Sequence, residues 1–159
     1  MSAKKRPEEI LLSIMRRSGQ SVAVAESCTG GMIAQRITNI PGSSDYFKLG
    51  VVAYSNDAKK ILLKISPHLL RKFGAVSEQV AIAMAQRVRR MVEADWGIAV
   101  TGIAGPGGAT KSKPVGLVYL AAAGPDDVIC RRHFFKGTRH NIRKKASEAA
   151  LDLLIRDLR

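Results

Sequence analysis

Ser27 is the residue whose position most strongly suggests chemistry. It stands between a compact β-type run and the glycine pair Gly30 and Gly31, which places it at a strand-to-helix turn. The N–H groups of Cys28, Thr29 and Gly30 would then form a helix N-terminus, which can stabilise an oxyanion or hold a phosphate. Serine is also a preferred helix cap, and the motif by itself favours that structural role. The segment matches neither G-x-S-x-G nor the Walker pattern, so neither of those chemistries is inferred.

A serine nucleophile needs a base, and Lys59 is the candidate. Lysine can take a proton if burial lowers its pKa. Ser27, the segment from Tyr54 to Lys59, and Thr101 each follow a predicted strand, and open α/β sheets bind ligands at the carboxyl ends of strands. The alternative is a solvated charge, because Lys59 stands beside Lys60 on a short predicted helix. The three histidines lie in no segment that is built around Ser27.

Two further features could belong to a site. Cys28 is a rival nucleophile if a helix N-terminus lowers the pKa of its thiol, although the role of a small buried filler is favoured. The loop from Thr101 to Gly108 includes Gly102 and Gly105, and such a loop can bring backbone N–H groups against a phosphate. Its alternative is a flexible turn. The acids, cysteines and histidines show no metal-ligand spacing, so we expect neither a metal nor a cofactor.

The elements that position these residues alternate between helix and strand and then become strand-rich. The predicted helices cover 7–17, 32–37, a segment around 59–63, 67–73, 78–94 and a final stretch from about 139; the predicted strands cover 21–25, 49–54, 96–100, 115–122 and 128–135. This order predicts an α/β fold with helices on both faces of a mixed sheet of about five strands.

Local signals also set the ends of these helices. Asn56 or Asp57 is expected to cap the helix that carries Lys59. Ser77 is expected to cap the longest middle helix, whose inner stripe should include Met91.

Composition limits the class of protein. The chain has 159 residues, of which 46% are hydrophobic and 25% charged, so we expect one ordinary domain over 1–159 and exclude a disordered chain. No apolar run is long enough to span a membrane, and Glu8 and Glu9 interrupt the stretch where a secretory signal would be apolar. Cys28 and Cys130 make no disulfide framework. These features predict a cytoplasmic protein with no membrane partner.

The net charge of +13 suggests an anionic partner. Residues 1–80 carry +6 and residues 81–159 carry +7, so no tail accounts for the excess. One stretch, 129–147, has no acidic residue and contains Arg131, Arg132, Lys136, Arg139, Arg143, Lys144 and Lys145. A solvated basic face explains most of these seven, and an anion site that uses one or two of them is the sharper interpretation.

Several motifs in one order resemble the CinA C-terminal domain family, from about Glu8 onward. They are Ala25–Gly31, Pro41–Ser44, Gly50–Asn56 with the following Lys59, Gly74–Glu78, Thr101–Pro106, Lys113–Gly116 and Phe135–Arg139. The family includes bacterial nicotinamide-nucleotide amidohydrolases, which convert nicotinamide mononucleotide to nicotinate mononucleotide and ammonia. Many members carry this domain behind a larger N-terminal domain that is absent from this sequence.

The resemblance implies a three-layer α/β/α sandwich and a Ser-Lys mechanism without a metal. It implies that Ser27 is the nucleophile and Lys59 its base, with Tyr54 and Thr101 positioning or polarising the reacting groups. The expected substrate contacts are Cys28, Thr29, Gly30, Gly31, Asn56, Gly102, Gly105 and Arg139, the last of these near the substrate phosphate.

Deamidation of nicotinamide mononucleotide in pyridine nucleotide recycling is therefore the leading functional hypothesis. The charge and the family's competence and damage-inducible label support an alternative, a nucleic-acid-binding accessory protein, but aromatic residues are only 5% and no nucleic-acid-binding motif is present. A family member that binds nucleotides without hydrolysis is the third possibility. A twofold homodimer is expected because it is the commonest assembly of soluble enzymes.

Overall fold

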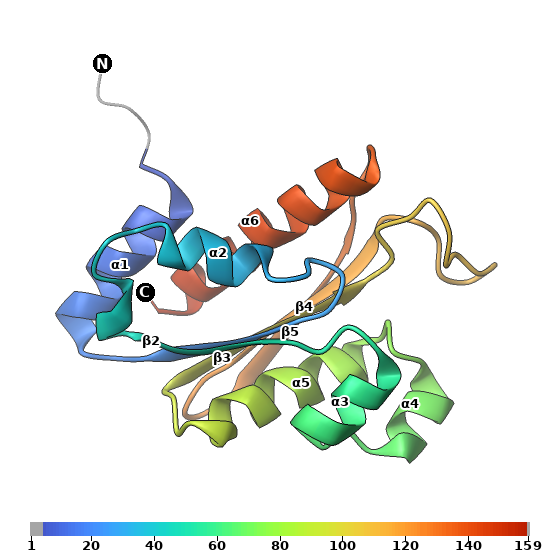
Figure 1. Ribbon diagram of the computed structural model, residues 1–159, viewed down its shortest axis with the longest axis horizontal. Coiled ribbons are helices and arrows are strands. Elements are labelled where there is room, and N and C mark those ends of the chain that lie inside the picture. The colour runs from blue at the N-terminus through green and yellow to red at the C-terminus, as the bar shows by residue number, and fades with distance from the viewer. Residues whose placement is uncertain (1–4, 159) are drawn as a thin grey trace.

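A computed structural model of the chain describes residues 5–158 and shows one five-stranded sheet. The sheet has the order β2-β1-β3-β4-β5 (Figure 1). Its strands are β1 (Val22–Glu26), β2 (Phe47–Val52), β3 (Trp96–Gly102), β4 (Leu117–Ala123) and β5 (Val128–Phe134). β1 pairs in parallel with β2 and β3, whereas β4 is antiparallel to both β3 and β5. The predicted mixed sheet is confirmed.

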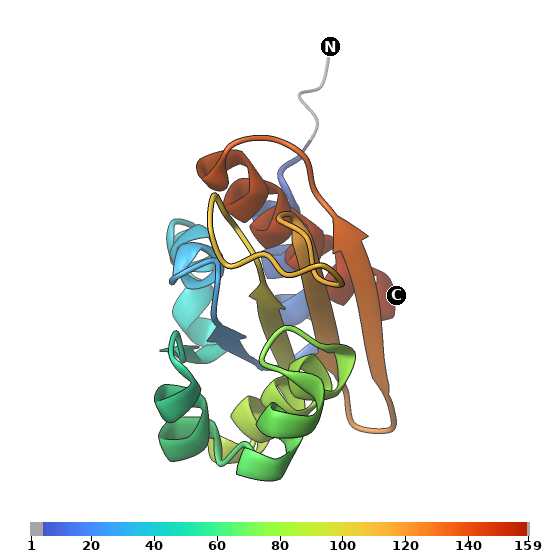
Figure 2. The same ribbon diagram turned by 90° about the vertical axis from the view of Figure 1, so that its right-hand side faces the viewer.

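Helices cover both faces of this sheet (Figures 1 and 2). One face carries α1 (Pro7–Ser18), α2 (Met32–Thr38) and α6 (Arg139–Asp157), and the other carries α3 (Asn56–Leu63), α4 (Pro67–Phe73) and α5 (Glu78–Met91). A single 3-10 turn, Ser43–Asp45, precedes β2. The fold is thus the expected three-layer α/β/α sandwich. Within residues 5–158, no helix combines the length and apolar character needed to cross a membrane.

The alternation of side chains along the central strands divides the interior into two cores. Val22 and Val24 of β1 face the α1, α2 and α6 side, whereas Ala23 and Ala25 face the α5 side. The small residues on the α5 side allow that helix to approach closely. At Gly97 of β3, an added Cβ would lie only 2.1 Å from a backbone oxygen of α5. Helices therefore pack closely against both faces of the central strands.

The strand order creates a topological switch point beside β1. The chain leaves β1 through α2 to reach β2 on one side, and then crosses through α3, α4 and α5 to reach β3 on the other side. Glu26, the last residue of β1, pairs with Val52 on one neighbour and Val100 on the other. Connections that diverge in this way leave a crevice at the carboxyl ends of the strands. Ser27 and Thr101 lie at that edge.

Two local predictions were wrong. The cap of α3 is Ser55, whose Oγ accepts a hydrogen bond from the Ala58 N–H at 3.0 Å, and not Asn56 or Asp57, which already lie within the helix. The helix α5 ends at Met91, because the chain then turns back toward β3, and Met91 is 47% exposed and is not part of the inner stripe. In both cases the order of elements is as predicted and the element ends differ, as they also do for β2, which was predicted over 49–54 and covers Phe47–Val52.

Candidate active site

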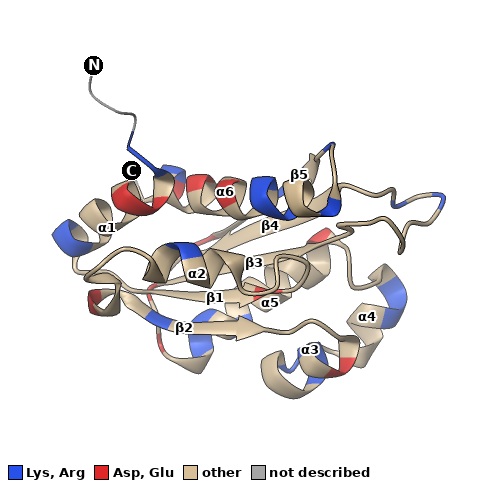
Figure 3. Cartoon of the chain, turned by 45° about the horizontal axis from the view of Figure 1, so that its top comes forward, with Lys and Arg blue, Asp and Glu red and all other residues tan. Residues whose placement is uncertain are grey.

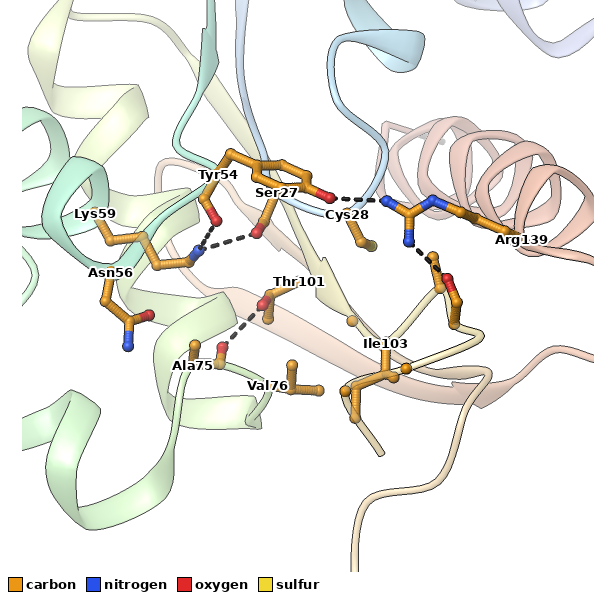
Figure 4. A pocket seen from close by; sticks show the side chains of 15 residues that line it. Ser27, Cys28, Tyr54, Asn56, Lys59, Ala75, Val76, Thr101, Ile103 and Arg139 are labelled. Atoms are coloured by element: carbon orange, nitrogen blue, oxygen red, sulfur yellow. Dashed lines mark hydrogen bonds between the residues drawn. The ribbon is translucent and has the colours of Figure 1, made fainter. Parts of the chain in front are cut away.

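A pocket of about 290 Å³ opens at the carboxyl ends of β1 and β3 (Figure 4). It is lined by Ser27, Cys28, Tyr54, Asn56, Lys59, Ala75, Val76, Thr101, Gly102, Ile103, Ala104, Gly105, Gly107, Gly108 and Arg139. Nine of the twelve residues singled out from the sequence are in this set, and Thr29, Gly30 and Gly31 are not. Within residues 5–158, no group of three or more His, Cys, Asp or Glu residues is placed to hold a metal ion.

Ser27 and Lys59 meet at the inner end of this pocket. The Ser27 Oγ and the Lys59 Nζ lie 2.9 Å apart, within hydrogen-bond distance. Ser27 comes directly after β1 and Lys59 lies on the inner side of α3, so the crossover of the chain brings together two residues that are 32 positions apart. Ser27 does not cap α2, because the cap residue of that helix is Gly31. The structural role that the motif alone favoured is therefore wrong.

The surroundings of Lys59 favour a neutral amine. Its side chain is 1% exposed, and it forms no ion pair with any carboxylate of residues 5–158. Burial lowers the pKa of Lys59 from its ordinary value, with a smaller opposing effect from Cys28. Nζ donates to the Ala53 carbonyl oxygen at 2.9 Å and lies 3.5 Å from the Tyr54 carbonyl oxygen. These carbonyls can accept both protons of a neutral amine, which leaves its lone pair for the Ser27 hydroxyl. The solvated-charge alternative is wrong.

Glu26 is a residue of the site region that the sequence analysis missed. Its carboxylate is 1% exposed and accepts hydrogen bonds from the Thr29 hydroxyl at 2.6 Å and from the Ile33 and Ala34 N–H groups at 2.9 and 3.0 Å. It therefore satisfies the start of α2, as an acidic group at a helix N-terminus does. The acid immediately before Ser27 was the available signal. The Thr29 side chain is turned toward Glu26 and away from the pocket.

The turn after Ser27 differs from the expected helix N-terminus. The helix α2 begins only at Met32, so Cys28 to Gly31 form a turn of their own. The Gly30 N–H donates to the Ser27 carbonyl oxygen at 3.1 Å and is no longer available to a ligand. Among the described residues, no acceptor is found for the N–H groups of Cys28 and Thr29. The donors that remain next to the Ser27 hydroxyl are thus backbone amides of this turn.

Cys28 behaves as a buried thiol. It is 6% exposed, and burial, reinforced by the nearby Glu26, raises the pKa of Cys28 to about 11. The helix dipole that could have lowered this pKa does not act directly on Cys28, because α2 starts four residues later. A protonated thiol is a poor nucleophile near neutral pH, so Ser27 is the better nucleophile at this turn.

The outer wall of the pocket is closed by a bridge from Arg139, the first residue of α6. Its Nη2 donates to the Tyr54 hydroxyl at 2.8 Å and its Nη1 donates to the Gly105 carbonyl oxygen at 2.7 Å (Figure 4). Tyr54 lies beyond the end of β2 and is 55% exposed. One guanidinium therefore ties together the segment after β2, the glycine-rich loop and α6.

Thr101 has a different set of contacts from the other pocket residues. It is 1% exposed, and its hydroxyl donates to the Ala75 carbonyl oxygen at 2.8 Å. That bond holds the segment before α5 against the end of β3. Because the hydroxyl proton is already donated, Thr101 can act on a ligand by accepting a hydrogen bond, or by donating after the bond to Ala75 is broken.

Fold and pocket together define an α/β/α protein with a paired serine and buried lysine at the switch point of a mixed sheet. The family model described as "CinA C-terminal domain" matches residues 4–158, and the chain belongs to this family. A putative competence-damage inducible protein of Moorella thermoacetica is 52% identical over 152 residues, which are 96% of this chain and 37% of that protein. The chain spans about a third of the length of the curated relatives it matches.

Solved structures of the same family have the same fold. The competence/damage inducible protein CihA of Agrobacterium tumefaciens matches with a TM-score of 0.91 and 40% identity, and the match covers 98% of both chains. A competence-damaged protein (CinA) superfamily protein of Enterobacter cloacae matches with a TM-score of 0.94 and 30% identity, over 100% of this chain and 96% of that one. The three-layer arrangement is thus common to this chain and to family members with low sequence identity.

Proposed function

We propose that the protein hydrolyses the carboxamide of nicotinamide mononucleotide to give nicotinate mononucleotide and ammonia. The observation that carries this proposal is the 2.9 Å contact between the Ser27 Oγ and the buried Lys59 Nζ. Amide hydrolysis requires a nucleophile, a group that carries a proton to the leaving amine, and donors for the oxyanion. Ser27, Lys59 and the turn after Ser27 provide one each.

In the first half of the reaction, Ser27 attacks the carboxamide carbon. Neutral Lys59 accepts the hydroxyl proton as the Oγ–C bond forms, and the carbonyl oxygen becomes an oxyanion. The N–H of Cys28, next to the nucleophile, is a suitable donor to that oxygen. Lys59 then returns the proton to the leaving nitrogen, the C–N bond breaks and ammonia departs. The product of this half is an acyl-enzyme in which the carboxyl group of nicotinate mononucleotide is esterified to Ser27.

In the second half, a water molecule attacks the ester. Lys59 takes a proton from the water, and the C–Oγ bond breaks as Ser27 regains its proton from Lys59. The carboxylic acid that forms loses its proton to solvent, and nicotinate mononucleotide leaves as the carboxylate. Each step needs Lys59 to be neutral before it accepts a proton, which is the state that its burial favours.

The rest of the pocket suits a nucleotide phosphate. Arg139 can exchange its bonds to Tyr54 and to the Gly105 carbonyl for charge-assisted bonds to phosphate oxygens. Asn56 and the glycine-rich loop that contains Gly102 line the same space and offer further polar contacts. In this proposal the nicotinamide end lies toward Ser27 and the phosphate lies toward Arg139.

Nucleic-acid binding is the second candidate, because relatives are named for competence and damage induction and the chain carries a net charge of +13. Figure 3 shows Lys and Arg residues gathered near the start of α6. Several of these charges are already engaged within the protein, since Arg139, Arg143 and Lys145 donate to backbone carbonyls. The paired Ser27 and buried Lys59, which nucleic-acid binding does not require, favour the hydrolase. The second candidate requires tight binding to DNA or RNA that persists near physiological salt.

The test is ammonia release from nicotinamide mononucleotide by the purified chain. We expect turnover by the wild type and loss of activity in Ser27→Ala and Lys59→Ala. Lys60→Ala is the matched control, because Lys60 is the neighbouring lysine and its Nζ pairs with Asp57 on the surface of α3. A wild type that releases no ammonia, or a Ser27→Ala variant that keeps full activity, contradicts the proposal.

A further inference from the structure

Arg143 of α6 holds the turn that follows Ser27. The Arg143 Nε donates to the Cys28 carbonyl oxygen at 3.1 Å, and its Nη2 donates to the Thr29 carbonyl oxygen at 2.9 Å. We propose that Arg143 is a positioning residue that fixes the oxyanion-stabilising amides beside Ser27. This inference rests on the proposed function, because it concerns the serine nucleophile of that reaction.

The orientation of the peptide groups carries the inference. In a trans peptide the C=O of one residue and the N–H of the next point in opposite directions. When Arg143 holds the Cys28 and Thr29 carbonyls, the N–H groups of Thr29 and Gly30 must point away from it. The Gly30 N–H then reaches the Ser27 carbonyl oxygen, and that bond in turn fixes the direction of the Cys28 N–H. Arg143 therefore holds two consecutive peptide groups directly and a third through the Gly30 N–H, while the Met32 N–H also donates to the Thr29 carbonyl oxygen at 3.2 Å.

The space around Arg143 agrees with this role. Gly30 has a φ of +60°, and an added Cβ there would lie 3.1 Å from the Arg143 Nη2, so the absence of a side chain leaves room for the guanidinium. Arg143 is half-buried and pairs with no carboxylate of residues 5–158. Nor is it among the residues that line the pocket. It therefore acts on the reaction through the turn and not by contact with the substrate.

The first experiment measures kcat and KM for nicotinamide mononucleotide in Arg143→Met and Arg143→Lys. Loss of one oxyanion donor typically lowers kcat by 10²–10³-fold, so we expect a loosened turn to lower kcat by roughly 10–100-fold. KM should stay within about twofold of the wild-type value, because these amides stabilise the oxyanion of the transition state and the ground-state amide carries no such charge. Arg143→Lys should recover part of kcat, since an ammonium can still bond one of the two carbonyls. Lys144→Met is the control, because it removes an exposed charge from the adjacent position of α6.

The second experiment does not depend on the substrate. A small alkyl fluorophosphonate reacts with an activated serine: the Ser27 Oγ–P bond forms, the P–F bond breaks, fluoride leaves and Lys59 takes the hydroxyl proton. The phosphoryl oxygen then occupies the position of the oxyanion. We expect the second-order labelling rate at Ser27 to fall by roughly 10-fold or more in Arg143→Met and to be unchanged in Lys144→Met. Urea unfolding of each variant checks that the protein is folded under the assay conditions.

The outcomes separate the two proposals. If the wild type labels at Ser27 but does not hydrolyse nicotinamide mononucleotide, the proposed substrate is wrong and the labelling rates alone decide the role of Arg143. The role of Arg143 is wrong if folded Arg143→Met labels as fast as the wild type, or if the wild type does not label at all. A large rise in KM with unchanged kcat overturns it as well, because that result indicates direct binding of the substrate.

Discussion

Replacing Lys59 by methionine tests whether the lysine is neutral in the folded protein. Methionine keeps a long unbranched side chain in the buried space but removes the amine. Burial lowers the pKa of Lys59 in the folded state from the ordinary value of 10.5. At a pH between the lowered folded-state pKa and the ordinary pKa of the unfolded chain, the unfolded chain binds one more proton than the folded chain. The free energy of unfolding must therefore rise with pH in this range. Below the folded-state pKa this contribution to the slope disappears.

The size of the effect follows from proton linkage. Within that window, Lys59 contributes up to about 1.4 kcal/mol of stability for each pH unit. In Lys59→Met this contribution is absent. The variant also leaves the Ala53 carbonyl without its donor, which costs about 1–3 kcal/mol at every pH. The difference in stability between wild type and variant should therefore grow as the pH rises.

Urea unfolding from about pH 6 to pH 10 measures this difference, and Lys60→Met provides the control for loss of a surface lysine. Cys28, whose raised pKa of about 11 gives a slope of opposite sign at high pH, is present in all three proteins, so most of its effect cancels in the comparison. The kcat/KM of the wild type should rise with pH to a plateau, with its midpoint at the folded-state pKa of Lys59. Parallel stability curves for the wild type and Lys59→Met over the whole range would refute the neutral-lysine mechanism.

Three further predictions concern the supports of the site. Glu26→Gln replaces a buried carboxylate that accepts three hydrogen bonds. It should lower the free energy of unfolding, measured in urea, by about 1.5–3 kcal/mol. An unchanged free energy of unfolding would mean that Glu26 does not hold the start of α2. Gly97→Ala should lower the free energy of unfolding by about 1–3 kcal/mol, because the new Cβ meets the backbone of α5. A melting temperature equal to that of the wild type would contradict this packing. Arg139→Met should weaken binding of nicotinate mononucleotide, measured by calorimetry, by about tenfold or more. An unchanged affinity would show that Arg139 does not contact the phosphate.

The architecture could be predicted because each element carries a local signal. The hydrophobic pattern of α6, the Ser77 cap of α5 and the turn between β4 and β5 are all short-range features, and the structure confirms them. The error in the cap of α3 fell where competing cap residues are close together. Ser55, Asn56 and Asp57 are all acceptable cap residues, and only the backbone path out of β2 selects Ser55.

The site could be predicted only in part, for a physical reason. The rule that ligands bind at the carboxyl ends of strands is sufficient to predict from the sequence that Ser27, Tyr54 and Thr101 lie at one edge of the sheet. No pattern along the chain shows that the Lys59 side chain is buried, or that the Thr101 hydroxyl donates to Ala75. Those facts depend on contacts between segments that are distant in sequence, which local propensities do not encode.

Two arginines of the basic stretch 129–147 make specific contacts with the segments around Ser27. Arg139 and Arg143 are four residues apart on α6, so their side chains lie on the same side of the helix. One donates to the glycine-rich loop at Gly105 and the other donates to the turn after Ser27. An acidic residue on this face of α6 would compete for both guanidinium groups and draw them away from the backbone carbonyls. The absence of acids between 129 and 147 therefore keeps two arginines available to organise the two segments that surround the serine.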